Sequence, residues 1–84
     1  MRHFASQQFW ELYRQLPTEI QDLADSKFEL LKQTPQHRSL NLKQVGRFWS
    51  VRVGRRYRAL GVESDEGMVW FWIGTHAQYD KLIK

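Results

Sequence analysis

The 84-residue chain contains no cysteine, which excludes disulfides, thiolate zinc sites and cysteine nucleophiles. It also lacks a long apolar run. The longest, Met68 to Ile73, has the length of a strand, and the segment from Met1 to Phe9 has no apolar core of a signal peptide or membrane span. We therefore expect a cytoplasmic protein that does not use a membrane as a partner.

Acidic residues are missing from the middle of the chain, between Leu30 and Val62. The same stretch holds eight cations: Lys32, Arg38, Lys43, Arg47, Arg52, Arg55, Arg56 and Arg58. The flanking segments, residues 1–29 and 63–84, each carry a net charge of −2. This asymmetry indicates a polyanionic partner, with nucleic acid as the first candidate. A solvated arginine surface would give the same count.

Aromatic residues, in contrast, are plentiful for one small domain, and we assign the whole chain, 1–84, to a single domain. Large rings bury much area each and can stabilise a small core without disulfides or metal. The four tryptophans could instead form a platform on which nucleic-acid bases stack. We expect Trp49 and one of Trp70 and Trp72 in the core, and reserve stacking for a ring that reaches an open face.

The first third of the chain predicts two helices that meet at Pro17. Ser6 is a suitable N-cap for the first helix, and Pro17 suits the first position of the second. The pair Thr34-Pro35 should end the second helix. Apolar residues recur at helical spacing in both: Phe9, Leu12, Tyr13 and Leu16 in the first, and Ile20, Leu23, Ala24, Leu30 and Leu31 in the second. A helical hairpin with one apolar side follows.

After Pro35 the apolar period changes from helical to two, which predicts strands. We expect strands at Phe48–Val53, Tyr57–Val62 and Met68–Ile73, an edge strand within Leu40–Val45 and a terminal helix at His76–Ile83. Because Met68–Ile73 is apolar on both faces, we expect it to be a central strand of the sheet with both of its faces covered by other parts of the protein. The predicted class is α+β in two layers, with the N-terminal helical hairpin packed on a three- to four-stranded antiparallel sheet and a short C-terminal helix.

This arrangement leaves one face of the sheet uncovered by the hairpin. The alternation of strand residues places Trp49, Val51 and Val53 on one face, and Arg52 and Arg58 from neighbouring strands on the other. An arginine-lined sheet face is a reasonable site for phosphates.

Two segments resemble the RelE/ParE toxin superfamily. The run from Trp49 to Gly61 is similar to its strand–turn–strand signature, with an Arg-Val-Gly element followed by Tyr-Arg. The run from Val69 to Tyr79 resembles its last strand and catalytic tail. Leu16-Pro17, Pro35 and Ser39-Leu40 match further upstream, so the resemblance spans nearly the whole chain.

The resemblance implies a toxin of a type II toxin–antitoxin module, neutralised by a cognate antitoxin that wraps the basic face. In the RelE-like branch, which we favour, the toxin cleaves mRNA in the ribosomal A site without metal or cofactor. In the ParE-like branch it inhibits DNA gyrase and lacks the nuclease residues. An inactive, RNA-binding relative is a third interpretation.

The same resemblance assigns the candidate site residues. Arg58 matches the arginine of the Tyr-Arg element and would stabilise a phosphate, whereas a salt bridge with Glu63 is the alternative. Arg52 would clamp the phosphate or support the 2′-hydroxyl, or be a solvated strand arginine. His76 stands where the family places a catalytic Arg or His, and imidazole can act as acid or base near neutral pH. The alternative for His76 is a capping or surface residue.

Tyr79 would stack on a base or donate a proton, or simply pack under the terminal segment. We expect Asp80 to pair with Lys81 or Arg52. Turn and edge cations are candidates for RNA backbone contacts: Lys43, Arg47, Arg55 and Arg56. Ser50 departs from the family pattern, because a basic residue is expected there in the most active branch. Neither His3 nor His37 has the neighbours that a metal site needs, so we predict no metal.

Overall fold

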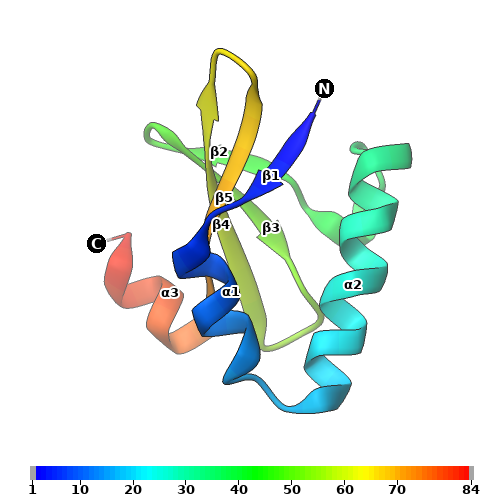
Figure 1. Cartoon of the computed structure of the whole chain (residues 1–84), viewed down its shortest axis with the longest axis vertical. Helices are drawn as coiled ribbons and strands as arrows, with labels where there is room; N and C mark the ends of the chain where they lie inside the picture. Colours follow the sequence, from blue (N-terminus) through cyan, green and yellow to red (C-terminus); the bar gives the residue numbers. More distant parts are fainter. Residues whose placement is uncertain (1, 84) are drawn as a thin grey trace.

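The computed structural model describes residues 2–83, which fold into helices packed on one sheet (Figure 1). Along the chain lie β1 (His3–Ala5), α1 (Gln7–Arg14), α2 (Thr18–Gln33), a short 3-10 turn (Arg38–Leu40), β2 (Lys43–Val45), β3 (Phe48–Arg52), β4 (Tyr57–Ser64), β5 (Gly67–Thr75) and α3 (His76–Leu82). The predicted α+β class is confirmed.

The two N-terminal helices begin and end close to their predicted limits. The Ser6 side chain accepts a hydrogen bond from Phe9 N at 3.2 Å, as an N-cap should. Pro17 is the N-cap of α2 rather than its first residue, and Thr34 is its C-cap. Gln21 Nε2 donates to the carbonyl oxygens of Tyr13 and Leu16, both at 3.1 Å, and so ties the two helices together at their connection.

The sheet has five strands in the order β1-β5-β4-β3-β2. Strands β2 to β5 form the predicted antiparallel meander, with Ser50 opposite Leu60 and Leu60 opposite Trp72. The prediction of three to four antiparallel strands was wrong in one respect, because β1 adds a fifth strand that runs parallel to β5. As a result β5 lies between β1 and β4, and β4 rather than β5 is central.

Helix α2 packs on one face of the sheet, which we name the first face. The core there joins Ala24 and Leu31 of α2 to almost fully buried residues of the sheet and of the segment after β3: Val51, Val53, Ala59, Trp70 and Ile73. Trp70 is the core tryptophan of the last strand, as one of the pair was expected to be. A Cβ at Gly61 would lie 2.8 Å from Trp70 Cε3, so glycine at 61 leaves room for the indole.

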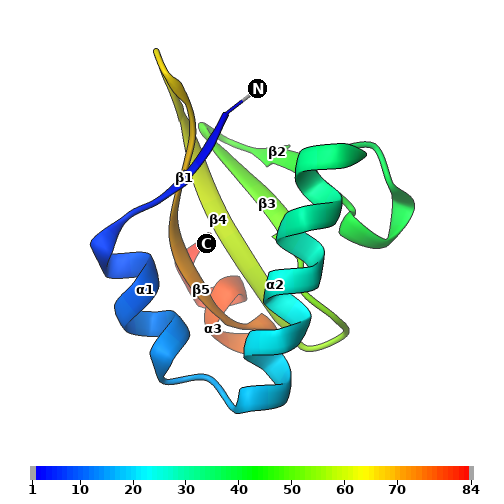
Figure 2. The same cartoon turned by 45° about the vertical axis from the view of Figure 1, so that its right-hand side comes forward.

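Helix α3 lies on the opposite, second face of the sheet, so this face is not fully open. Figures 1 and 2 show α2 and α3 on opposite sides of β4 and β5. A Cβ at Gly74 would lie 2.7 Å from Gln78 Oε1 of α3, which shows how closely the helix approaches the strand. The expectation of one fully uncovered face is therefore corrected: α3 covers the end of the second face near Arg58, and Ser50 and Leu60 on the same face are each only 2% exposed.

His3 anchors β1 to the core and supplies a pH-dependent term in stability. Its Nδ1 accepts a hydrogen bond from Trp70 Nε1 at 3.1 Å, and burial lowers the pKa of His3 below its ordinary value of 6.5. A lowered pKa means that folding favours the neutral ring, so this stabilisation is present above the unfolded pKa. It is lost as the pH falls through the lower folded pKa.

We therefore expect the free energy of unfolding to be smaller at about pH 5.5 than at about pH 7.5. Urea unfolding of the parent and of His3→Gln would measure this. The variant should lose part of the pH dependence, whereas His37→Gln should keep it. An unchanged pH dependence in His3→Gln would contradict the assignment.

Candidate functional site

Two arginines face each other across the central strands. Arg52 of β3 and Arg58 of β4 are register partners, and directly opposed residues of antiparallel strands point to the same face. Arg52 is exposed, whereas Arg58 is only 8% exposed. Like charges placed directly opposite destabilise a sheet. The chain thus carries a local repulsion that a bound anion would relieve.

Arg58 is held in place by its own backbone surroundings. Its Nη1 donates to Tyr57 O at 2.8 Å and to Gly54 O at 3.3 Å. Burial and the charge of Arg52 lower the pKa of Arg58, while Tyr79 and Asp80 raise it. A guanidinium still keeps its charge at any ordinary pH and has five N–H donors. Arg58 is therefore a fixed cation rather than a mobile surface charge.

His76 opens α3 directly after the last strand. Thr75 is the N-cap: its Oγ1 accepts from Gln78 N at 3.1 Å, and Gln78 Oε1 accepts from Thr75 N at 2.9 Å. His76 N donates to Arg56 O at 2.7 Å, which ties the helix start to the β3–β4 turn. The imidazole Nδ1 lies 3.0 Å from Asp80 Oδ2, and the side chain is 45% exposed.

These contacts connect the four predicted catalytic residues in one region of the second face. Arg58 is paired with Arg52 on one side and with Gly74, next to the start of α3, on the other. Electrostatic interactions with Tyr79 and Asp80 both raise the pKa of Arg58, and Asp80 also contacts His76. The arrangement combines two cations, an imidazole held by a carboxylate and a phenol.

Tyr79 is buried, with 4% of its surface exposed. Its ring packs 6.0 Å from the His76 ring, centroid to centroid, in an edge-on arrangement. Burial leaves little ring face for stacking on a base and agrees with packing under the terminal segment. Its hydroxyl is buried and has no hydrogen-bond partner among the described residues. A buried hydroxyl without a partner is costly, so a ligand oxygen would be a favourable neighbour.

The four predicted RNA-binding cations are all exposed but do not lie together. Arg55 and Arg56 occupy the β3–β4 turn, beside the start of α3. Lys43 lies opposite Ser50 on the second face. Arg47 precedes β3 at its other end, with Cζ 5.2 Å from the Phe48 ring centroid. The cations thus border the second face at both ends and along the β2 edge.

The alternative ion pair of Arg58 with Glu63 and the expected ion pair of Asp80 are both replaced by other contacts. Glu63 accepts a hydrogen bond from Trp49 Nε1 at 2.7 Å and does not pair with Arg58. Asp80 contacts His76, rather than Lys81 or Arg52. Helical spacing places residues 76 and 80 on the same side of α3, so the sequence did contain a sign of this pair.

Sequence reasoning also missed the side-chain order of β5. The register shifts between Leu60 and Gly61: Leu60 pairs with Trp72, but Gly61 pairs with Trp70. Phe71 is the extra residue of this β-bulge. Its ring lies 5.4 Å from that of Phe48, centroid to centroid, so Phe71 joins Trp72 on the second face. A bulge re-aims side chains in this way, and simple alternation cannot reveal it.

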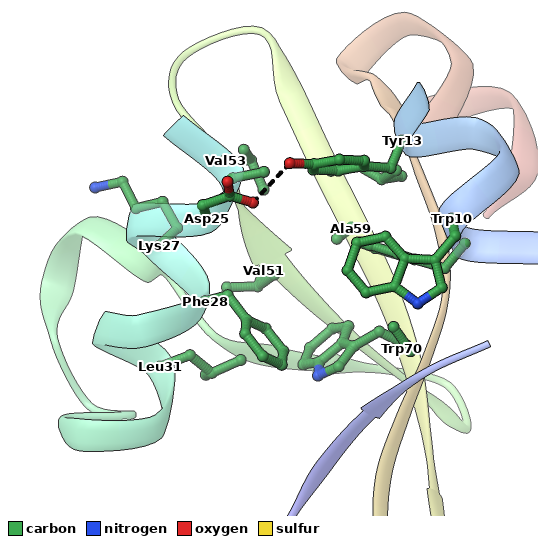
Figure 3. A pocket seen from close by; sticks show the side chains of 14 residues that line it. Trp10, Tyr13, Asp25, Lys27, Phe28, Leu31, Val51, Val53, Ala59 and Trp70 are labelled. Carbon is green, nitrogen blue, oxygen red and sulfur yellow. Dashed lines mark hydrogen bonds between the residues drawn. The ribbon is translucent and has the colours of Figure 1, made fainter. Parts of the chain in front are cut away.

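A separate apolar pocket opens between α1, α2 and the first face (Figure 3). Trp10 lies at its rim, and Phe28 and Trp70 form part of its wall. Tyr13 Oη donates to Asp25 Oδ1 at 2.8 Å across it; burial and this bond raise the pKa of Tyr13. The pocket lies on the other side of the sheet from the arginine pair and holds neither Arg52 nor Arg58.

Among residues 2–83, no three His, Cys, Asp or Glu side chains gather as metal ligands. Within the same residues, no helix combines the length and the apolar character that spanning a bilayer requires.

Comparison with known proteins identifies a family and a similar fold. A chain of the RelB-RelE antitoxin-toxin complex from Methanococcus jannaschii is similar in structure, with a TM-score of 0.73 and 12% sequence identity over 96% of this chain and 99% of that chain. No curated protein matches the sequence. The model of the ParE-like toxin domain matches residues 18–81, a range that includes the arginine pair and His76. The chain therefore belongs to the ParE-like toxin domain family, within the RelE/ParE superfamily of toxins.

Proposed function

We propose that this toxin is a metal-independent, ribosome-dependent endonuclease that cleaves mRNA and arrests translation. One observation carries the proposal: Arg52 and Arg58 lie side by side on the second face, where α3 adds His76, its carboxylate partner Asp80 and the hydroxyl of Tyr79. These are the chemical groups that RNA cleavage without metal requires, namely cations for a charged transition state and groups that transfer protons.

In the proposed reaction the 2′-oxygen of a nucleotide attacks the adjacent phosphorus, and the bond from phosphorus to the 5′-oxygen breaks. The products are a 2′,3′-cyclic phosphate and a 5′-hydroxyl. Arg58 and Arg52 stabilise the additional negative charge on the phosphoryl oxygens. With Nδ1–H directed to Asp80, Nε2 of His76 has a free lone pair and takes the proton of the 2′-hydroxyl. The Tyr79 hydroxyl, which is buried in the unbound structure, returns a proton to the 5′-oxygen once RNA binding uncovers it.

The exposed cations support the choice of RNA and ribosome as partners. Lys43, Arg47, Arg55 and Arg56 would contact phosphates of the mRNA or of ribosomal RNA, since such contacts position a protein without reading bases. We further propose a cognate antitoxin whose acidic segment covers this face. The similar structure from Methanococcus jannaschii is that of an antitoxin–toxin complex. A cytoplasmic location would follow from such partners.

A second candidate function is inhibition of DNA gyrase without RNA cleavage. Two observations favour it: the matching family is described as ParE-like, and position 50 carries a serine that is 2% exposed rather than a cation. A buried serine cannot add positive charge at the phosphate site. The two candidates predict different cellular targets and can be separated in one experiment.

The test is primer extension on a reporter mRNA after induction of the toxin, with and without active ribosomes. We expect new 5′ ends within translated codons, and their loss when initiation is blocked. Plasmid supercoiling and the DNA-damage response are followed in the same cells. Intact mRNA with relaxed or broken DNA would replace the nuclease by the gyrase inhibitor, and growth without either effect would indicate an inactive relative.

A further inference from the structure

Three aromatic side chains lie together on the second face, beside the arginine pair. Phe48 of β3 has the same strand parity as Ser50 and Arg52, and its ring contacts that of Phe71 at 5.4 Å with the planes tilted by 56°. Trp72 lies opposite Leu60, one row from Arg58. We name Phe48, Phe71 and Trp72 the aromatic strip. All three are partly exposed, unlike Trp70 on the first face.

The bulge in β5 is what creates this strip. In a regular strand Phe71 and Trp72 would point to opposite faces. With the register shift after Gly61, Trp70 and Ile73 both enter the first-face core, and the two residues between them are left to the second face. Two consecutive large rings thus stay partly exposed on one face, where hydrophobic burial alone would favour placing one of them inside. Such a local departure from regular geometry often marks a binding surface.

The Trp72 ring is held in a fixed position next to the phosphate site. A Cβ at Gly74 would lie 2.6 Å from Trp72 Cζ2 and 2.9 Å from Cη2, so the indole covers the backbone of Gly74. Gly74 is the register partner of Arg58. The indole therefore reaches from the row of Trp72 over Gly74 into the row that carries the arginines. A base stacked on the indole would thus lie directly beside a phosphate held by the arginine pair.

Cations border the aromatic strip. Lys43 is in the same cross-strand row as Trp72, Arg52 is in the neighbouring row, and Arg47 lies with Cζ 5.2 Å from the Phe48 ring. Aromatic rings on a sheet flanked by cations suit a flexible polyanion that carries planar rings, because the bases stack while the cations follow the backbone. A purely apolar partner would not use the cations, and duplex DNA would not present its base faces.

We propose that the aromatic strip binds unstacked bases of single-stranded RNA, with Trp72 under the base next to the phosphate held by Arg52 and Arg58. The choice of RNA as the ligand rests on the proposed function. The proposal assigns Phe48, Phe71 and Trp72 as base-binding residues. Stacking on rings accepts any base, so the strip adds affinity and register along the strand rather than sequence preference.

The test is the affinity of the purified protein for a short single-stranded RNA and for an abasic strand of the same length and charge, measured by fluorescence anisotropy. We expect the base-bearing strand to bind roughly tenfold more tightly, a typical contribution of one stacked base. Trp72→Leu should remove most of this ratio and leave the dependence on salt unchanged. Lys43→Gln should reduce the salt dependence and keep the ratio.

Trp10→Leu is the matched control, since Trp10 is 42% exposed but lines the pocket of the first face. It should keep the ratio of the parent protein, and thermal unfolding checks that both variants fold. Equal affinities of the parent for the two strands would overturn the proposal, as would a ratio that Trp72→Leu and Phe71→Leu leave intact. An aromatic strip that serves only a protein partner would give that second result. The assay needs neither ribosomes nor cleavage, so it can succeed or fail independently of the nuclease test.

Discussion

Replacing Arg58 with lysine should slow ribosome-dependent mRNA cleavage by on the order of 100-fold, the usual effect of losing one preorganised donor to a developing anion. Lysine keeps the positive charge but has a compact ammonium in place of the planar fork. It cannot donate to Tyr57 O and Gly54 O from one fixed plane and still direct further N–H groups to a phosphate. The rate of appearance of cut codons on the reporter mRNA measures the loss.

The lysine variant is preferable to alanine as a test. Arg58→Ala should also relieve growth arrest, but it removes two hydrogen bonds to backbone carbonyls, at about 1 kcal/mol of stability for each, and leaves Tyr57 O with only the bond from Val53 N. Arg55→Lys is the control, because Arg55 is exposed in the β3–β4 turn and would contact a phosphate as a simple charge. If Arg58→Lys cleaves at the rate of the parent, Arg58 does not stabilise the transition state.

The elements with strong local patterns were predictable. The Ser6 cap, the break at Pro17 and the strand at Phe48–Arg52 are each determined by neighbouring residues, and the structure confirms them. The adjacency of Arg52 and Arg58 also followed, because a short turn between two strands fixes which residues are opposite. Two of the four candidate catalytic residues could therefore be placed side by side once the β-hairpin was predicted.

Strand β1 was not predictable in the same way. His3–Ala5 is too short for a period of two to be visible, and its pairing is with residues more than sixty positions away. What holds it is tertiary: Ser6 N donates to Trp70 O at 2.9 Å, and Trp70 Nε1 donates to His3. Contacts of this kind depend on the finished sheet, so no local sequence pattern indicates them.

The sequence also failed to predict the position of α3 and the bulge in β5. The helix itself was expected, but the face it would cover depends on the turn at Gly74-Thr75, which sequence does not specify. The bulge moves Phe71 to the face of Trp72 through a single extra residue. Both features act on the second face, so the sequence predicted which residues could form a site better than it predicted the surface around them.

Replacing His76 with alanine should lower the cleavage rate by about 100- to 10,000-fold, the usual contribution of a side chain that transfers a proton in the transition state. The imidazole is 45% exposed, so its removal should change stability little. RNA affinity should also stay close to that of the parent, since the arginines and the exposed cations remain. Single-turnover cleavage on programmed ribosomes separates the rate from binding.

Two further variants make the result specific. Asp80→Asn keeps a polar partner at Nδ1 of His76 but removes its charge, so it should slow cleavage by less than His76→Ala does. His37→Ala changes an exposed histidine at the start of the 3-10 turn and should leave the rate unchanged. If His76→Ala lowers RNA affinity but not the single-turnover rate, the imidazole binds RNA and does not transfer the proton. The base for the 2′-hydroxyl would then have to be another group on the second face.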